Sequence, residues 1–381
     1  MIRIMMLRHS KNSINRIGLL IFSLKLLVNY GISVEYHERK IMSIINIKEI
    51  NRKELKETIK AMGQPAFRET QIFEWLCKGA SSWEEMTNVP KTLKEKLQEK
   101  FGFDSLSVEL EQVSSDGTRK YLLRCPDGEH VEAVFMQYEY GNSLCVSTQV
   151  GCNMGCKFCA STIGGKRRNL KAWEILDEFL VIRKAAGADI NHIVLMGMGE
   201  PFDNYDEVSE FLRRIHDPEG INLSYRNITV STCGLIPMIE RFGDDFPQVN
   251  LAISLHAATQ EDREEIMPIA KKYNLNSLIS TCRAHEEKTG RRISYEYTLI
   301  LGQNDSLEHA SKLAELLKGQ LCHVNLIPLN PVLETGMKGA SRESAQVFAE
   351  RLEKLGIPAT VRRELGSDID AACGQLRKKL L

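Results

Sequence analysis

Apolar and polar positions follow two different patterns along this chain, and the change falls near Gly141. From Met42 to about Gly102, apolar residues recur every three or four positions, which is typical of amphipathic helices. After Gly141, short apolar runs alternate with helical stretches. The pattern predicts a small N-terminal domain of three or four helices, followed by a larger α/β region.

Local signals mark the helix starts in the N-terminal part. Asn51 is followed three residues later by Glu54, the spacing of a capping box, at the start of NRKELKETIKAM. Pro90 suits the first turn of the segment KTLKEKLQEKF. Both segments are therefore predicted to be helices.

A β-hairpin is predicted between the two regions. Its strands are the runs Thr118–Cys125 and His130–Met136. The turn Cys125-Pro126-Asp127-Gly128 has proline at its second position and glycine at its fourth, as in a type I turn.

Six short apolar runs beyond the hairpin are each followed by a helical stretch. Buried strands that alternate with helices favour a parallel sheet, here a partial (β/α)6 barrel, with functional groups at the C-terminal ends of the strands. The predicted strands are Leu144–Val150, His192–Met196, Asn227–Ser231, Asn250–Leu255, Ile293–Ile300 and His323–Pro328.

The first 41 residues differ from the rest. An apolar run, Ile17–Val28, follows several basic residues, which is the order found in a signal peptide. The run is too short to span a bilayer and contains Lys25. We interpret residues 1–41 as an extension upstream of a start at Met42, with a peripheral amphipathic helix as the alternative.

Composition is that of an ordinary globular protein, with 50 basic and 50 acidic residues among 381. No net charge draws the chain toward nucleic acid, so any RNA contact must depend on local patches. The basic groups available are Lys166-Arg167-Arg168, Arg291-Arg292, Arg362-Arg363 and Arg377-Lys378-Lys379.

Three of the ten cysteines, Cys152, Cys156 and Cys159, lie within eight residues and have the spacing C-x3-C-x2-C. Cysteines this close are poor disulfide staples but good ligands for one metal centre in a reducing cytoplasm. Zinc sites usually pair two C-x2-C arms, and the loop has no second arm. The spacing favours a 4Fe-4S cluster with one open iron, while zinc or plain buried thiols remain the alternatives.

Glycine and polar residues, with Leu255 between two of them, follow several of the predicted strands. Each is a weak signal alone, but together they offer hydrogen-bonding partners for a nucleoside and an amino acid on one rim. They are Gly199, Glu200, Ser231, Ser254, Leu255, His256 and Asn330.

The chain resembles a known family in five segments: CVSTQVGCNMGCKFCASTIGGKRRNL, GMGEP, SLHA, LIPLNP and DIDAACGQL. From Met42 onward it resembles the RlmN-type radical S-adenosylmethionine (SAM) RNA methyltransferases. The resemblance implies that the three loop cysteines hold a 4Fe-4S cluster, whose open iron chelates the amino and carboxylate groups of SAM. It also implies that the seven rim residues bind SAM.

The resemblance gives roles to three more residues. Taken alone, Cys145 reads as a core thiol, Cys373 as a tail thiol and Glu132 as a solvated carboxylate. In the family, the position of Cys373 carries a methyl group, that of Cys145 resolves a covalent intermediate, and that of Glu132 accepts a proton.

The reaction implied is methylation of carbon 2 of an adenosine in the peptidyl-transferase region of 23S rRNA. Members of this type commonly also modify the adenosine 3′ of the anticodon in tRNAs. Two SAM molecules are used per turnover, and a Cys145–Cys373 disulfide is left to be reduced. Flavodoxin or ferredoxin is the implied electron donor, and a cytoplasmic monomer without membrane contact is expected.

Two other functions remain open. The related Cfr-type enzymes methylate carbon 8 of the same rRNA adenosine, and the shared cysteines do not separate the two types. A non-catalytic iron–sulfur protein that binds RNA or senses redox state would not need Glu132, Cys145 and Cys373 together. The expected organisation is a helical RNA-binding domain over 42–104, a hairpin linker over 105–140 and the barrel with its C-terminal cysteine segment over 141–381.

Overall fold

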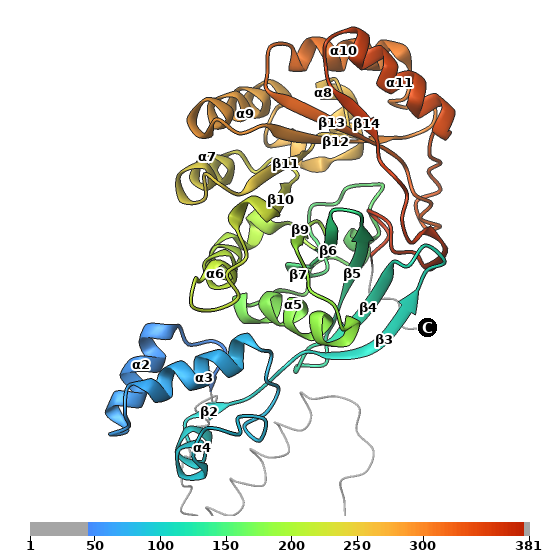
Figure 1. Cartoon of the computed structure of the whole chain (residues 1–381). Helices are drawn as coiled ribbons and strands as arrows, with labels where there is room; N and C mark the ends of the chain where they lie inside the picture. Colours follow the sequence, from blue (N-terminus) through green and yellow to red (C-terminus); the bar gives the residue numbers. More distant parts are fainter. Residues whose placement is uncertain (1–44, 377–381) are drawn as a thin grey trace, which may run out of the picture. The chain divides into compact units, whose positions relative to one another are not determined.

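The computed structural model describes residues 45–376 (Figure 1). The predicted extension over residues 1–41 and the basic residues 377–379 lie outside the described part. Within residues 45–376, no helix is both long and apolar enough to cross a membrane.

The N-terminal domain contains helices α2 (Arg52–Ala61), α3 (Phe67–Cys77) and α4 (Lys91–Gln98). Strands β1 (Ile45–Asn46) and β2 (Phe101–Gly102) pair in parallel. The predicted capping box is present at α2, and Pro90 is the N-cap residue of α4, one position before the helix. The domain has its own core of apolar side chains: Ile47, Leu55, Ile59, Ile72, Trp83, Met86, Leu93 and Leu97.

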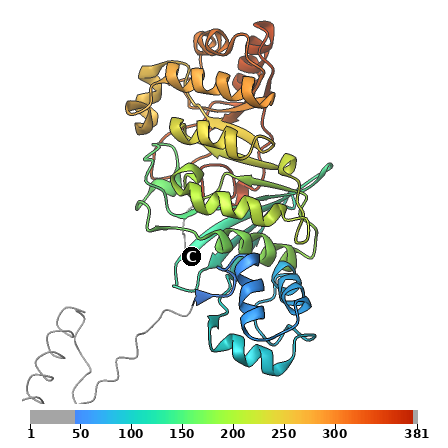
Figure 2. The ribbon, with the colours of Figure 1, turned by 90° about the vertical axis from the view of Figure 1, so that its left-hand side faces the viewer.

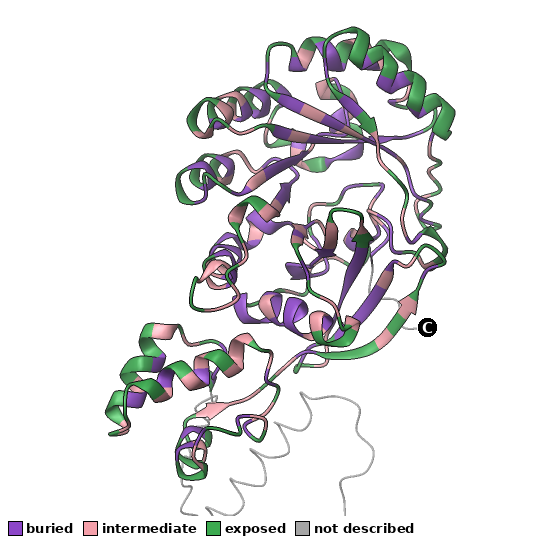
Figure 3. Ribbon diagram, in the orientation of Figure 1, coloured by how far each residue is buried: buried purple, intermediate pink, exposed green. Residues whose placement is uncertain are grey.

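The predicted hairpin forms and belongs to the main sheet. Strand β4 (Arg119–Arg124) pairs antiparallel with β5 (His130–Tyr138), and the amide of Gly128 donates to the Cys125 carbonyl oxygen across 2.9 Å. Strand β5 then pairs antiparallel with β6 (Gly141–Cys145). An edge strand that the sequence did not predict, β3 (Ser107–Val113), pairs with β4. It is mostly exposed (Figure 3), so it lacks the apolar run that marks a buried strand.

The sheet has ten strands in the order β14-β13-β12-β11-β10-β9-β6-β5-β4-β3, and the seven from β14 to β6 are parallel. All six predicted parallel strands are present. The first is shorter than predicted, because the chain leaves the sheet after Cys145 and forms a separate strand, β7 (Gln149–Val150). The other five are β9 (His192–Leu195), β10 (Ile228–Thr232), β11 (Asn250–Ser254), β12 (Ile293–Leu299) and β13 (Cys322–Pro328). The seventh parallel strand, β14 (Ala359–Val361), was not predicted, because three residues are too few to show a pattern.

Helices cover one face of the parallel strands. Figure 1 shows α5 to α7 and α9 on the same side of the sheet, and Figure 2 shows helices stacked in front of it. The strands and the inner helix faces supply most of the buried apolar side chains (Figure 3). The seven helices of the barrel are α5 (Ala172–Ala186), α6 (Tyr205–His216), α7 (Ile236–Asp245), α8 (Gln260–Ile266), α9 (Leu275–Thr289), α10 (Leu307–Leu317) and α11 (Arg342–Lys354).

The C-terminal segment, residues 362–376, connects the two edges of the curved sheet. It leaves β14 at one edge, and at the other edge the Asp368 carboxylate accepts from the Ser114 hydroxyl at 2.5 Å. The Lys120 ammonium, on β4, donates to the carbonyl oxygen of Asp370 at 3.3 Å. The segment therefore lies across the open side of the partial barrel.

A buried ion pair joins the helical domain to the barrel. The Lys48 ammonium is 2.6 Å from the Asp177 carboxylate on α5, and the two side chains are 7% and 1% exposed. The other carboxylate oxygen of Asp177 accepts from the Leu106 amide at 2.8 Å. Removal of either charge would leave its partner buried and uncompensated, a costly change.

Candidate active site

The loop that carries the three clustered cysteines is closed at its base by a short pair of strands. Strand β7 pairs antiparallel with β8 (Arg168–Asn169), so residues 151–167 form a closed loop. Gly151, at the base, has a φ of +76°, and a Cβ atom there would lie 2.1 Å from the Gly165 carbonyl oxygen. Only glycine fits this close crossing of the backbone.

Cys152, Cys156 and Cys159 all line one cavity of about 150 Å³. Cys152 and Cys156 are buried, and Cys159 is partly exposed. Burial raises the pKa of the Cys152 thiol to about 12. Thiols in such surroundings stay protonated unless a positive charge stabilises the thiolate, as a bound metal centre does for its ligands.

The three thiols fit an iron–sulfur cluster better than a single metal ion. Among residues 45–376, no three His, Cys, Asp or Glu side chains converge closely enough to hold one ion. In a 4Fe-4S cluster each thiolate binds a different iron, so the ligands are spaced around a larger body. A cavity lined by three separate thiols meets that requirement.

Six of the seven predicted SAM-binding residues line the same cavity as the cysteines: Gly199, Glu200, Ser231, Ser254, His256 and Asn330. They come from the C-terminal ends of different parallel strands and from the loops that follow them. The seventh, Leu255, is fully buried outside the cavity lining, and its amide donates to the Glu296 carbonyl oxygen at 3.0 Å.

Glu200 is held in the cavity wall by backbone amides. Its carboxylate oxygens accept from the Phe202 amide at 3.0 Å and from the Cys233 amide at 2.8 Å. Burial raises the pKa of this carboxyl. Gly199 precedes it with a φ of +105°, and a Cβ atom there would lie 2.7 Å from the Gln149 side chain. Glu200 therefore presents a fixed acceptor group in the wall of the cavity.

His256 presents a neutral ring to the cavity. Its Nδ1 accepts from the Thr298 amide at 3.0 Å, so the ring proton is on Nε2. Burial lowers the pKa of His256 to about 3, with a smaller contribution from Arg263. His256 can therefore donate a hydrogen bond to a ligand without adding charge.

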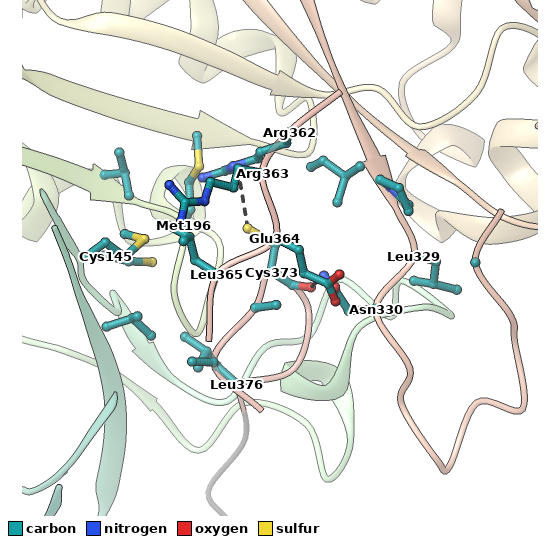
Figure 4. A pocket seen from close by; sticks show the side chains of 18 of the residues that line it. Cys145, Met196, Leu329, Asn330, Arg362, Arg363, Glu364, Leu365, Cys373 and Leu376 are labelled. Carbon is teal, nitrogen blue, oxygen red and sulfur yellow. Dashed lines mark hydrogen bonds between the residues drawn. The ribbon is translucent and has the colours of Figure 1, made fainter. Parts of the chain in front are cut away.

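Cys145 and Cys373 lie in a second cavity, of about 280 Å³ (Figure 4). Cys145 ends β6 and is 7% exposed, and burial followed by the neighbouring Cys373 raises its pKa to about 12. Cys373, which is half-buried, lines both cavities. All ten cysteines, including these two, are free thiols in the structure.

The segment around Cys373 is tied to the cysteine loop. The Ala160 amide donates to the Gly374 carbonyl oxygen at 2.7 Å, and the Ser161 hydroxyl donates to the Leu376 carbonyl oxygen at 2.7 Å. The Asn330 side-chain amide donates to the Cys373 carbonyl oxygen at 3.0 Å. These bonds position the Cys373 sulfur beside the cysteine-lined cavity, although no regular element carries it.

Glu132 is buried on β5, at 3% exposure, and does not line either cavity. Its carboxylate is 3.7 Å from the Lys120 ammonium. Side chains two residues apart on a strand share a face, and Val134 and Met136 on that face line the second cavity. Glu132 is therefore on the strand face that lines this cavity, two residues before Val134.

Arg362 and Glu296, which were not predicted from the sequence as site residues, also belong to the site. The Arg362 guanidinium donates to the Cys373 sulfur at 3.4 Å and is 3.6 Å from the Glu296 carboxylate. The sequence placed Arg362 only in a basic group. Arg362 could have been predicted from its position directly after β14, because residues that follow parallel strands lie at the functional rim of such a barrel.

Two protein families match parts of the sequence. Residues 146–314 match the radical SAM superfamily, and residues 45–102 match the ribosomal RNA large subunit methyltransferase N-terminal domain. The two matched ranges correspond to most of the barrel and to the helical domain.

Individual relatives cover nearly the whole described chain. A probable dual-specificity RNA methyltransferase RlmN of Clostridium perfringens is 51% identical over 339 residues, 88% of this chain and 97% of that protein. A protein of the same name from Alkaliphilus oremlandii is 50% identical, over 89% of this chain and 99% of that protein. The crystal structure of a radical SAM methyltransferase from Sphaerobacter thermophilus is similar with a TM-score of 0.84 and 44% identity, covering 88% of this chain and 100% of that one.

Proposed function

Because this chain belongs to the RlmN family of radical SAM RNA methyltransferases, we propose that it methylates carbon 2 of an adenosine in the peptidyl-transferase region of 23S rRNA. We propose the adenosine 3′ of the anticodon in tRNAs as a second substrate. The family membership establishes a SAM-dependent enzyme with a 4Fe-4S cluster. The target atom and the RNA species are the proposed part.

The observation that carries the proposal is the position of Cys373 between two cavities. One cavity contains the three loop cysteines and the predicted SAM-binding residues, and the other contains Cys145. A sulfur at this boundary can take a methyl group from SAM on one side and present it to a base on the other. The second cavity, at about 280 Å³, is the proposed site of the adenine.

The low reactivity of the target carbon explains why the methyl group is first transferred to a cysteine sulfur. Carbon 2 of adenine lies between two ring nitrogens and is too electron-poor to attack the methyl group of SAM. A thiolate is a strong nucleophile, so Cys373 takes the methyl group and S-adenosylhomocysteine leaves. The cluster, when bound, supplies the electron that cleaves a second SAM and generates the oxidant needed at that methyl group.

Glu132 and Cys145 act in the later steps of the proposed reaction. Once the methyl carbon on Cys373 is joined to carbon 2, Glu132 accepts the proton that leaves this carbon. The Cys145 thiolate then attacks the Cys373 sulfur, the bond from that sulfur to the methylene carbon breaks, and this carbon takes up a proton to become the methyl group of the base. The cluster, when bound, would take up the remaining electron, and a disulfide is left for reduction.

We assign the helical domain a role in holding RNA. Lys53 and Lys56 lie around a surface depression that Phe67 also lines, beside Arg52, which is paired with Glu69 and Glu219. Phe67 is 54% exposed, and the Arg68 guanidinium lies 4.7 Å from its ring centroid. Basic side chains beside an exposed ring suit phosphate contact and base stacking.

We also propose that the protein is a cytoplasmic monomer and that it receives electrons from flavodoxin or ferredoxin.

The test is mass spectrometry of nucleosides from RNA treated with enzyme, SAM and a reductant under anaerobic conditions. The proposal expects 2-methyladenosine from 23S rRNA and from tRNA, and no product with the Cys373→Ala variant. Production of 8-methyladenosine would assign the Cfr-type reaction instead. If neither product forms in protein with a full cluster, the proposed substrate is wrong.

A further inference from the structure

Arg362 lies where the two cavities meet and lines both of them. Its backbone amide donates to the Leu326 carbonyl oxygen at 2.8 Å, which fixes the residue at the end of β14 beside β13. The side chain points from there toward Cys373 (Figure 4). A cation therefore stands at the boundary where the proposed methyl transfer takes place.

Cys373, Glu296 and Tyr138 surround the guanidinium. Its Nη1 donates to the Cys373 sulfur at 3.4 Å, drawn as the dashed line in Figure 4, and lies 3.6 Å from Oε2 of Glu296. Glu296 is 5% exposed, and its Oε1 accepts from the Asn325 side-chain amide at 2.8 Å. Glu296, held by Asn325, thus fixes Arg362 against the sulfur.

We propose that Arg362 holds Cys373 as the thiolate that attacks the methyl group of SAM. The Cys373 thiol releases its proton to solvent, and its sulfur forms a bond to the methyl carbon. The bond from that carbon to the SAM sulfonium breaks, and neutral S-adenosylhomocysteine leaves. Arg362 is unchanged in this step, which requires no oxidant or reductant.

The charges near Arg362 agree with this role. Cys373 is the main cause of the raised pKa of Arg362, ahead of the opposing effect of burial and the favourable one of Glu296. Methylation turns the negative sulfur into a neutral thioether, and Glu296 then remains as the counter-ion of Arg362. An arginine suits this site because it stays protonated when partly buried, whereas a lysine can lose its charge there.

The same cation faces Cys145, which lines the second cavity with Arg362. Arg362 opposes the burial that raises the pKa of Cys145. One guanidinium therefore lies beside both cysteines, in contact with the Cys373 sulfur and in the same cavity as Cys145. The inference rests on the proposed function for its substrate, but the state of the Cys373 thiol can be measured without RNA.

The experiment follows alkylation of Cys373 by iodoacetamide across pH, read out by peptide mass spectrometry. The cluster-loaded full chain is used, without SAM or RNA. In Arg362→Gln, the loss of a charged hydrogen-bond donor should raise the midpoint of the profile by about one to two pH units. Alkylation near pH 7 should become about 10- to 100-fold slower. Arg283→Gln, on α9, removes an arginine that lines neither cavity and serves as the control, with an unchanged profile expected.

A second variant gives the opposite shift. Glu296→Gln removes the negative charge that competes for Arg362, so the midpoint should move to lower pH. A merely structural role for Arg362 would not shift the alkylation midpoint in opposite directions in the two variants. If Arg362→Gln fails to fold, the shift in Glu296→Gln alone tests the inference. The inference is overturned if either folded variant has the wild-type profile. Shifted profiles without any methyladenosine would contradict the proposed RNA substrate alone.

Discussion

The two cavities that meet at Cys373 are built from different kinds of structure. The cavity that contains the loop cysteines is lined by residues at the ends of β9 to β13, which lie in register in a parallel sheet. The cavity that contains Cys145 is closed by residues 362–376, a segment with little regular structure. Hydrogen bonds to β4, to Asn330 and to the cysteine loop hold this segment in place.

The difference separates two requirements of the chemistry. Binding of a cluster and SAM needs many fixed groups, which a set of parallel strand ends provides. Sulfur transfer needs few groups, but one of them must border both cavities. A segment that crosses the open side of the barrel places Cys373 there.

The largest expected effect comes from breaking the first cavity. Cys156→Ala removes one of the three proposed cluster ligands, so reconstituted protein should fall from about four irons per chain to almost none. RNA methylation should fall to background. Cys282→Ala removes a buried thiol on α9 that lines neither cavity and should keep its iron. Full iron in Cys156→Ala, measured by colorimetric iron analysis, would remove this residue from the ligand set.

Glu132→Gln should slow the transfer of the methyl carbon to RNA and leave the methylation of Cys373 unchanged. Without the proton acceptor, methylated RNA should form about 10²- to 10⁴-fold more slowly, the usual contribution of general base catalysis. Methyl loading of Cys373, measured by mass spectrometry of the intact protein, should stay at the wild-type level. Glu111→Gln on β3 is the control. Loss of loading in Glu132→Gln would mean that the Lys120–Glu132 pair acts by supporting the fold.

The parts predicted from the sequence are those with a local pattern. The cysteine loop and the six strands were visible because ligand spacing and apolar runs are properties of neighbouring residues. Strand β3 was missed because Glu109 and Glu111 leave it without an apolar run. Arg362 was read as one member of a basic pair, because its contact with Cys373 depends on how the last segment folds back.

The roles of Cys145, Cys373 and Glu132 could be suggested only by family resemblance. Glu132 alternates with apolar residues and would be read as solvated on a half-exposed strand. In the structure both faces of β5 are buried, so the alternation does not separate an inner face from an outer one. Burial of this kind depends on strands and segments that are distant in the sequence.

A smaller effect is expected when the tether of the C-terminal segment is weakened. Ser161→Ala removes the hydrogen bond to the Leu376 carbonyl oxygen, worth about 0.5–1.5 kcal/mol. Amide hydrogen exchange in residues 371–376 should speed up about 2- to 10-fold, with iron content unchanged. Ser311→Ala, on α10, removes a comparable bond to the Leu307 carbonyl oxygen and is the control. Unchanged exchange would show that the other bonds hold the segment without Ser161.

The last prediction concerns stability and depends on pH. It involves Glu178, a fully buried residue on α5 that lines neither cavity. Its Oε2 accepts from the Ser147 amide at 3.0 Å, and burial raises its pKa well above the ordinary value. Because the folded pKa is raised, the stability that this group contributes is complete below the unfolded value of about 4.3 and declines as pH rises.

Glu178→Gln should remove this decline while leaving both halves of the reaction active. Thermal unfolding at pH 4 should be similar for the variant and the wild type, and at pH 8 the variant should gain stability relative to the wild type. Parallel melting curves across this range would show that Glu178 titrates alike in the folded and unfolded states.

The central claim is that Cys373 carries carbon from SAM to RNA across the boundary of the two cavities. The most direct test treats 23S rRNA with Cys145→Ala protein, SAM and reductant, and then maps any protein–RNA adduct by digestion and mass spectrometry. The account predicts a stable adduct on the peptide that contains Cys373, joined through one methylene carbon to an adenosine. Normal turnover without an adduct, or an adduct on a different residue, would contradict it.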